Sequence, residues 1–69
     1  MKYVIKINKD KIIDRIWLWQ ELIHREIGPA YENNMGYKAW WKEGNRHRID
    51  GPAIIYPNRT AEYWTEGFL

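Results

Sequence analysis

The sequence predicts an all-β domain, an antiparallel meander built on a 23-residue hairpin repeat. The first observation is an internal period, because His24-Arg25 and Gly28-Pro29-Ala30 recur 23 residues later as His47-Arg48 and Gly51-Pro52-Ala53. The second is that short aromatic or aliphatic segments alternate with turn residues about every 8–12 residues, as in short antiparallel strands. The third is size, since a chain of 69 residues makes one domain, so residues 1–69 are expected to fold together.

The first 15 residues are predicted to form a basic N-terminal strand region. In "KYVIKIN", Tyr3, Ile5 and Ile7 alternate with polar residues, which is the period of a half-buried strand, and Lys9-Asp10 is the predicted turn after it. The region has five basic and two acidic residues, a net charge of +3, whereas the whole chain carries +2. Residues 16–69, which hold two and a half repeats, are therefore slightly acidic.

Residues 14–27 match two kinds of secondary structure. Apolar residues from Ile12 to Ile27 recur at spacings of three and four, and Asp14 could cap a helix there. A strand is nevertheless the preferred prediction, because a shift of 23 residues aligns Trp17 with Trp40 and then with Tyr63. A short helix near residues 14–27 stays open as the alternative.

The second copy of the repeat gives the clearest strand pattern. "YKAWWKEG", residues 37–44, is short and aromatic, and Glu43 to Arg46 supplies the Gly and Asn of a chain reversal. His47 is expected to begin the returning strand, and Gly51-Pro52 to interrupt it because proline has no N–H to donate. "AIIY", a turn at residues 57–60 and "AEYWT" complete the predicted meander.

The pattern W-x3-G-x2-HR-x-DGPA, from Trp40 to Ala53, resembles the HRxDGPA (MORN-like) repeat of short proteins from bacteriophages and large DNA viruses. The resemblance covers Ile16 to Gly67 and implies a viral origin and an all-β repeat, with no enzymatic activity general to the family. The first copy departs from the pattern, with Glu21 at the turn glycine and Ile27 at the aspartate. The repeat motif comprises His24, Arg25, Gly28 and Pro29, followed by His47, Arg48, Asp50, Gly51 and Pro52.

Two interpretations compete for His47, Arg48 and Asp50. A catalytic one makes His47 a general base that Asp50 orients, but alternation along a strand places these two on opposite faces. A structural one pairs Arg48 with Asp50 on one face, while His47 hydrogen-bonds a neighbouring repeat. The structural interpretation is preferred because packing solutions recur in each repeat, whereas active sites are rarely duplicated in one tiny domain. The chain is therefore predicted not to be an enzyme.

No metal, cofactor or nucleic acid is predicted to bind. His24 and His47 are the only histidines and cysteine is absent, so a zinc site would need a carboxylate such as Glu26 or Asp50. Acidic residues stand among the basic and aromatic residues of the repeats, which argues against nucleic acid. No stretch approaches the ~20 apolar residues of a membrane span. The expected location is the cytoplasm, that of the host cell if a phage encodes the protein.

The aromatic strands favour a binding surface. Most of the rings are expected to form the core, but adjacent rings on a strand point to opposite faces, and a sheet this small cannot bury both. Trp, Tyr and Arg are enriched at binding hot spots. The predicted function is therefore a phage-type accessory protein that binds and inhibits a host protein, such as a component of an antiviral defence system. The predicted partner-binding residues are Trp40, Trp41, Arg46, Arg48, Tyr63 and Trp64.

Two alternatives stay open. The chain could sequester a nucleotide or other small ligand, with His47 and Arg48 reading a phosphate, although it lacks a phosphate-cradling glycine loop. It could also be a self-associating structural repeat that forms a homo-oligomer, since open sheet edges invite pairing.

Overall fold

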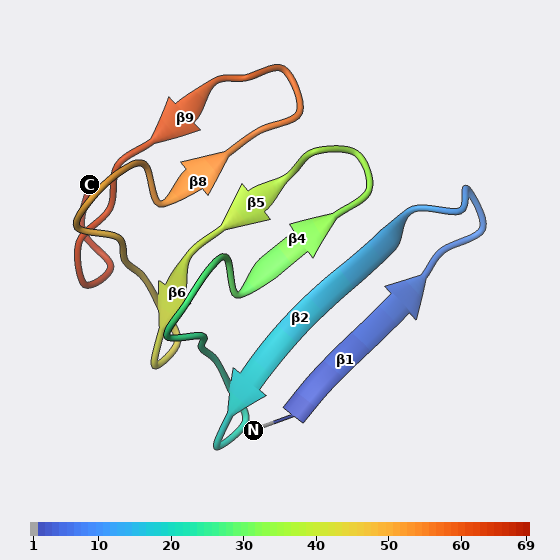
Figure 1. Ribbon diagram of the computed structural model, residues 1–69, viewed down its shortest axis with the longest axis horizontal. Coiled ribbons are helices and arrows are strands. Elements are labelled where there is room, and N and C mark those ends of the chain that lie inside the picture. The colour runs from blue at the N-terminus through green and yellow to red at the C-terminus, as the bar shows by residue number, and fades with distance from the viewer. Residues whose placement is uncertain (1) are drawn as a thin grey trace.

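The computed structural model describes residues 2–69 as an all-β fold of short antiparallel strands (Figure 1). Met1, with which the predicted N-terminal region begins, lies outside the described residues. The preferred strand prediction for residues 14–27 is confirmed, and the helix alternative is not what forms. No helix in the described part of the chain is long and apolar enough to cross a membrane. The strands are β1 (Lys2–Ile7), β2 (Ile13–Trp19), β3 (Leu22–Ile23), β4 (Tyr31–Asn33), β5 (Lys38–Ala39), β6 (Trp41–Lys42), β7 (Asn45–Arg46), β8 (Ile54–Ile55) and β9 (Ala61–Glu62).

Three hairpins, β1–β2, β4–β5 and β8–β9, lie side by side in chain order (Figure 1). They form one sheet of order β1-β2-β4-β5-β8-β9, in which β3 pairs with the end of β2, while β6 and β7 form a separate hairpin. The register repeats with the sequence: Ile16 pairs with Tyr31 between β2 and β4, and Ala39 pairs with Ile54 between β5 and β8. The predicted 23-residue period is thus a period of strand pairing.

The turns that close the three hairpins share one backbone design. Lys11, Gly36 and Arg59 occupy the same position near the end of their turns, each with positive φ, at 62°, 100° and 71°. The side-chain oxygen of Asn8 accepts the N–H groups of Asp10 and Ile12, which fixes the first turn where Lys9-Asp10 was predicted. The turn predicted at residues 57–60 also forms, between β8 and β9.

Tight turns of a second kind project from the other ends of the hairpins. The central residues are Gln20-Glu21, Glu43-Gly44 and Glu66-Gly67, and all six have φ between 51° and 87°. Positive φ at both central residues is the requirement of a type I′ hairpin turn. The first copy therefore makes the same reversal as the second, although Glu21 stands where the other copies have glycine.

The fully buried core is aliphatic and small, so the expectation of an aromatic core is wrong. Buried alanines lie where neighbouring hairpins are joined, since the Ala30 carbonyl accepts the Trp17 N–H at 2.8 Å and the Ala53 carbonyl accepts the Trp40 N–H at 2.7 Å. The aromatic rings of residues 2–69 are all half-buried or exposed. Tyr3, Ile5 and Ile7 of β1 are exposed rather than half-buried. The buried apolar residues are Ile16, Ala30, Ala39, Ala53 and Ile54.

Candidate functional site

Each His-Arg segment begins where a tight hairpin ends, and its backbone is tied to the preceding aromatic strand. The His24 N–H donates to the Trp17 carbonyl at 2.9 Å, and the His47 N–H donates to the Trp40 carbonyl at 3.0 Å. The next residue is bonded to the following repeat, since the Arg48 N–H donates to the Trp64 carbonyl at 3.1 Å. These backbone bonds position the side chain of each arginine over the ring of the preceding tryptophan.

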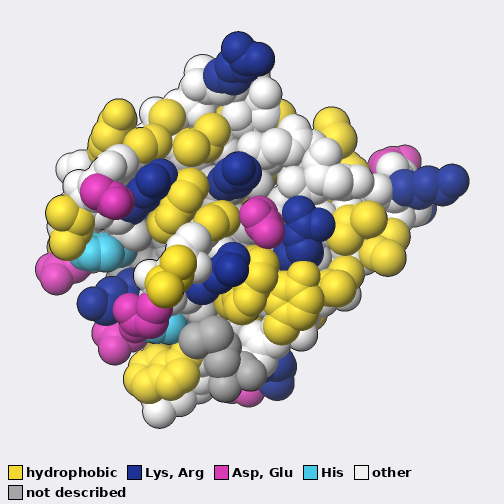
Figure 2. Space-filling model, viewed as in Figure 1, with side chains coloured by type: hydrophobic (Ala, Val, Ile, Leu, Met, Phe, Trp, Pro, Cys, Tyr) yellow, Lys and Arg dark blue, Asp and Glu magenta, His cyan; other side chains and the backbone are white. Residues whose placement is uncertain are grey.

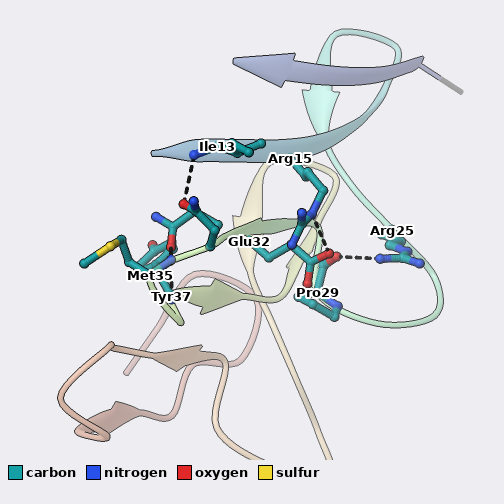
Figure 3. Close-up of polar contacts among 9 residues, drawn as sticks. Ile13, Arg15, Arg25, Pro29, Glu32, Met35 and Tyr37 are labelled. Carbon is teal, nitrogen blue, oxygen red and sulfur yellow. Dashed lines mark hydrogen bonds and ion pairs between the residues drawn. The ribbon is translucent and has the colours of Figure 1, made fainter. Parts of the chain in front are cut away.

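The first arginine clamp consists of Trp17, Arg25 and Pro29. The guanidinium carbon of Arg25 lies 3.9 Å from the centroid of the Trp17 ring, a cation–π contact. Nη1 of Arg25 donates to the Pro29 carbonyl at 3.1 Å, as Figure 3 shows. A Cβ on Gly28 would lie 3.3 Å from the guanidinium, and the φ of Gly28 is 92°, so both space and backbone favour glycine there.

The second arginine clamp consists of Trp40, Arg48 and Pro52 and has the same geometry. The guanidinium carbon of Arg48 lies 3.9 Å from the Trp40 ring, and Nη1 donates to the Pro52 carbonyl at 3.1 Å. A Cβ on Gly51 would approach the guanidinium carbon to 2.8 Å. The glycine of the Gly-Pro-Ala motif is thus the residue that leaves room for the arginine.

The two histidines accept hydrogen bonds from the next repeat. The N–H of Glu43 donates to Nδ1 of His24, and the N–H of Glu66 donates to Nδ1 of His47, both at 3.0 Å. The expectation that His47 bonds a neighbouring repeat is therefore confirmed. Because Nδ1 accepts in each ring, the proton of the neutral imidazole lies on Nε2, and that nitrogen is a donor.

The two residues between the arginine and the glycine differ between the copies. The first copy has Glu26-Ile27 and the second has Ile49-Asp50, so the acidic and apolar positions are exchanged. Nε2 of His24 donates to Glu26 at 2.9 Å, whereas Nε of Arg48 donates to Asp50 at 3.2 Å. The predicted Arg48–Asp50 pair is confirmed, and the first clamp has no counterpart of it.

A groove of about 490 Å³ lies between the two His-Arg loops. We call it the inter-repeat groove, lined by Arg25, Ile27, Lys42, His47, Ile49 and Asp50 among others. Ile27 and Ile49 are each 84% exposed at its sides. Sequence reasoning missed both isoleucines, although an apolar residue within a charged loop of a repeat is a readable signal of exposure. Figure 2 shows a face on which basic, acidic and apolar side chains alternate over the strands.

The six predicted partner-binding residues fall into separate groups. Trp40 and Arg48 belong to the second arginine clamp. Arg46 lies against two rings, 5.3 Å from the Trp41 centroid and 4.7 Å from that of Trp64. Tyr63, which aligns with the clamped tryptophans, is 67% exposed and stands apart.

An ion pair and two partly buried tyrosines lie on the neighbouring strands β2 and β4 and the turn that follows. Figure 3 shows Arg15 of β2 paired with Glu32 of β4, with Nε 3.2 Å from the carboxylate. Burial raises the pKa of Tyr31 above its usual range, and the carboxylate of Asp14 raises it further. Burial also raises the pKa of Tyr37. These hydroxyls therefore stay neutral at physiological pH and act as hydrogen-bonding groups.

The chain matches no protein-family model, and neither a curated protein nor a solved structure matches it significantly. Within residues 2–69, no three side chains of the kind that bind metals are grouped to hold an ion. What this protein does has therefore to be inferred from the clamps, the histidines and the inter-repeat groove.

Proposed function

We propose that this protein is a non-catalytic binding module of the phage accessory type, which acts by covering a surface of a host protein. Its short length and its resemblance to phage repeat proteins support a host partner, and a component of an antiviral defence system is the class we favour. A chain of 69 residues can inhibit by occlusion without chemistry of its own.

The observation that carries the proposal is the occupation of both histidines. In each ring the Nδ1 lone pair already accepts a backbone N–H, and Nε2 carries the proton. A general base needs a free lone pair within reach of the substrate, and neither His24 nor His47 offers one. The histidines of the repeated motif therefore join neighbouring repeats through these hydrogen bonds.

The exposed apolar residues support a protein partner. Ile27 and Ile49 project from adjacent loops beside half-buried tryptophans, and their burial against a partner would stabilise a complex. Tryptophan and arginine, which form the clamps, are the residues enriched at binding hot spots. The inter-repeat groove is therefore the centre of the proposed interface.

The test is affinity capture from bacterial lysate with the tagged chain, after nuclease treatment, at low and high salt. We expect one dominant host protein to be retained in high salt, and its purified form to lose activity on addition of the chain. The matched control is the double variant Ile27→Ser and Ile49→Ser, which should lose capture while keeping the wild-type circular dichroism spectrum. Equal capture by the folded double variant would reject the inter-repeat groove as the interface. Capture of no dominant host protein, or no inhibition of the captured protein, would contradict the proposed function.

A further inference from the structure

The inter-repeat groove has basic groups that the fold leaves unpaired. Each of its acidic residues accepts one hydrogen bond, Glu26 from His24 and Asp50 from Arg48. Among the ion pairs formed by residues 2–69, none includes Arg25 or Lys42. Arg25 keeps only its ring contact and its bond to the Pro29 carbonyl.

His47 adds a third donor to the same groove. Its Nδ1 accepts the Glu66 N–H at 3.0 Å, so Nε2 carries a proton, and no hydrogen bond from Nε2 forms within the described part of the chain. In the first copy the equivalent Nε2 of His24 is satisfied by Glu26. The exchange of Glu26-Ile27 for Ile49-Asp50 thus leaves an unpaired arginine in one loop and an unpaired histidine N–H in the next.

Apolar side chains flank these donors. Ile27 takes the place at which an aspartate would neutralise Arg25, and Ile49 takes the place at which a glutamate would satisfy His47. Both isoleucines are 84% exposed and line the groove. A free phosphate would satisfy the donors but would gain nothing from the isoleucines, whereas a peptide with acidic and aliphatic side chains would use both.

We propose that the inter-repeat groove binds an acidic, extended segment of a partner protein, with carboxylates on Arg25, Lys42 and His47 and an aliphatic side chain between Ile27 and Ile49. Charge complementarity supports this occupant, because the three cations that line the groove, Arg25, Lys42 and Arg48, outnumber its two carboxylates, Glu26 and Asp50. The proposal rests on the proposed function and specifies the chemistry of the partner.

The experiment titrates the full chain with fluorescein-labelled peptides and follows anisotropy and ¹H–¹⁵N spectra. The main probe alternates glutamate and leucine; the comparison probes replace glutamate with glutamine, or leucine with serine, and inorganic phosphate is tested alone. We expect the acidic leucine peptide to bind at least about tenfold more tightly than either peptide analogue. Its spectral changes should be confined to the two loops and the β6–β7 hairpin.

The repeat itself supplies the decisive variants. Ile27→Asp gives Arg25 the carboxylate that Arg48 already has, and the second copy shows that the loop accommodates it. It should weaken binding by about tenfold, while Asp50→Asn, which frees Arg48, should strengthen binding a few-fold. Ile7→Asp, the same chemical change on exposed β1, should leave the affinity within about twofold.

Binding that ignores Ile27→Asp in a variant with an intact spectrum would overturn the proposal. Equal affinity for the glutamine peptide, or equal shifts with phosphate alone, would also overturn it. Capture of a host protein equally by wild type and Ile27→Asp would reject the groove but keep the proposed function. Peptide binding confined to the groove, without any captured host protein, would keep the groove proposal but reject the proposed function.

Discussion

Replacing Arg48 with lysine should cost far more stability than a charge-conserving surface substitution usually does. Lysine keeps the positive charge but loses the planar fork that stacks on Trp40 while donating to Pro52 and Asp50. The ring contact is worth about 0.5–1 kcal/mol at a partly exposed site. The charged hydrogen bond to the Pro52 carbonyl adds about 1.5 kcal/mol.

The ion pair contributes least to this estimate. The side chain of Asp50 is 87% exposed, so its pair with Arg48 is worth about 0–0.5 kcal/mol. Arg48→Lys should therefore lower the free energy of unfolding by about 2–3 kcal/mol and the melting temperature by roughly 10–20 °C. Arg25→Lys should cost nearly as much, because the first clamp lacks only the ion pair.

Urea unfolding at 25 °C, followed by circular dichroism and tryptophan fluorescence, measures both losses. A double-mutant cycle with Trp40→Leu should give a coupling to Arg48 of about 0.5–1 kcal/mol. A loss below about 0.5 kcal/mol for Arg48→Lys, with no coupling to Trp40, would refute the clamp as a source of stability.

Three further predictions follow from the same structure. Glu21→Gly should raise the free energy of unfolding by about 0.5–1 kcal/mol, because Glu21 has a φ of 64° where later copies use glycine; an unchanged urea midpoint would contradict this. His24→Ala should cost about 1–3 kcal/mol and more than His47→Ala, since His24 is only 5% exposed, and equal urea midpoints would contradict it. Stability should fall as pH rises above about 10, because burial raises the pKa of Tyr31 and Tyr37 in the fold relative to the unfolded chain. Urea midpoints that stay constant from pH 9 through the alkaline range would oppose the last prediction.

Matched variants separate these effects from general destabilisation. Tyr31→Phe and Tyr37→Phe together should reduce the alkaline loss while keeping the fold, because phenylalanine has no proton to release. A Glu21→Ala variant should not reproduce the gain of Glu21→Gly, because alanine is also strained at positive φ.

The repeat pattern predicted most of the backbone. The 23-residue shift placed most strands, the turns and the Arg48–Asp50 pair, because these depend on residues close together in the sequence. The returning strand expected to begin at His47 is instead β7, Asn45–Arg46, which ends before it. A hydrogen bond between His47 and a neighbouring repeat was also predicted, and the Glu66 N–H supplies it.

The packing was harder to predict. Trp17 and Arg25 are eight residues apart in the sequence, and they meet because a tight turn and a backbone bond fold the chain back. Neither the strand period nor the helix period predicts a contact at this spacing. The core was misassigned because side-chain size alone pointed to the rings, whereas the fully buried positions include Ala30 and Ala53, whose carbonyls join neighbouring hairpins. The inter-repeat groove depends on which charges remain unpaired, and that follows only from the three-dimensional contacts.

The periodic bonding implies an order in which the molecule opens. Because equivalent bonds join each unit to the next, its stability resembles a sum of nearest-neighbour couplings, and the ends should fray first. Tyr63 stands at the clamped aromatic position but is 67% exposed, and within residues 2–69 no arginine stacks on its ring, so the unit around β8 and β9 is held less firmly. Amide hydrogens near Glu66 should therefore exchange early. Those of Trp17 and Trp40, which donate to the Ala30 and Ala53 carbonyls of the next hairpin, should exchange late.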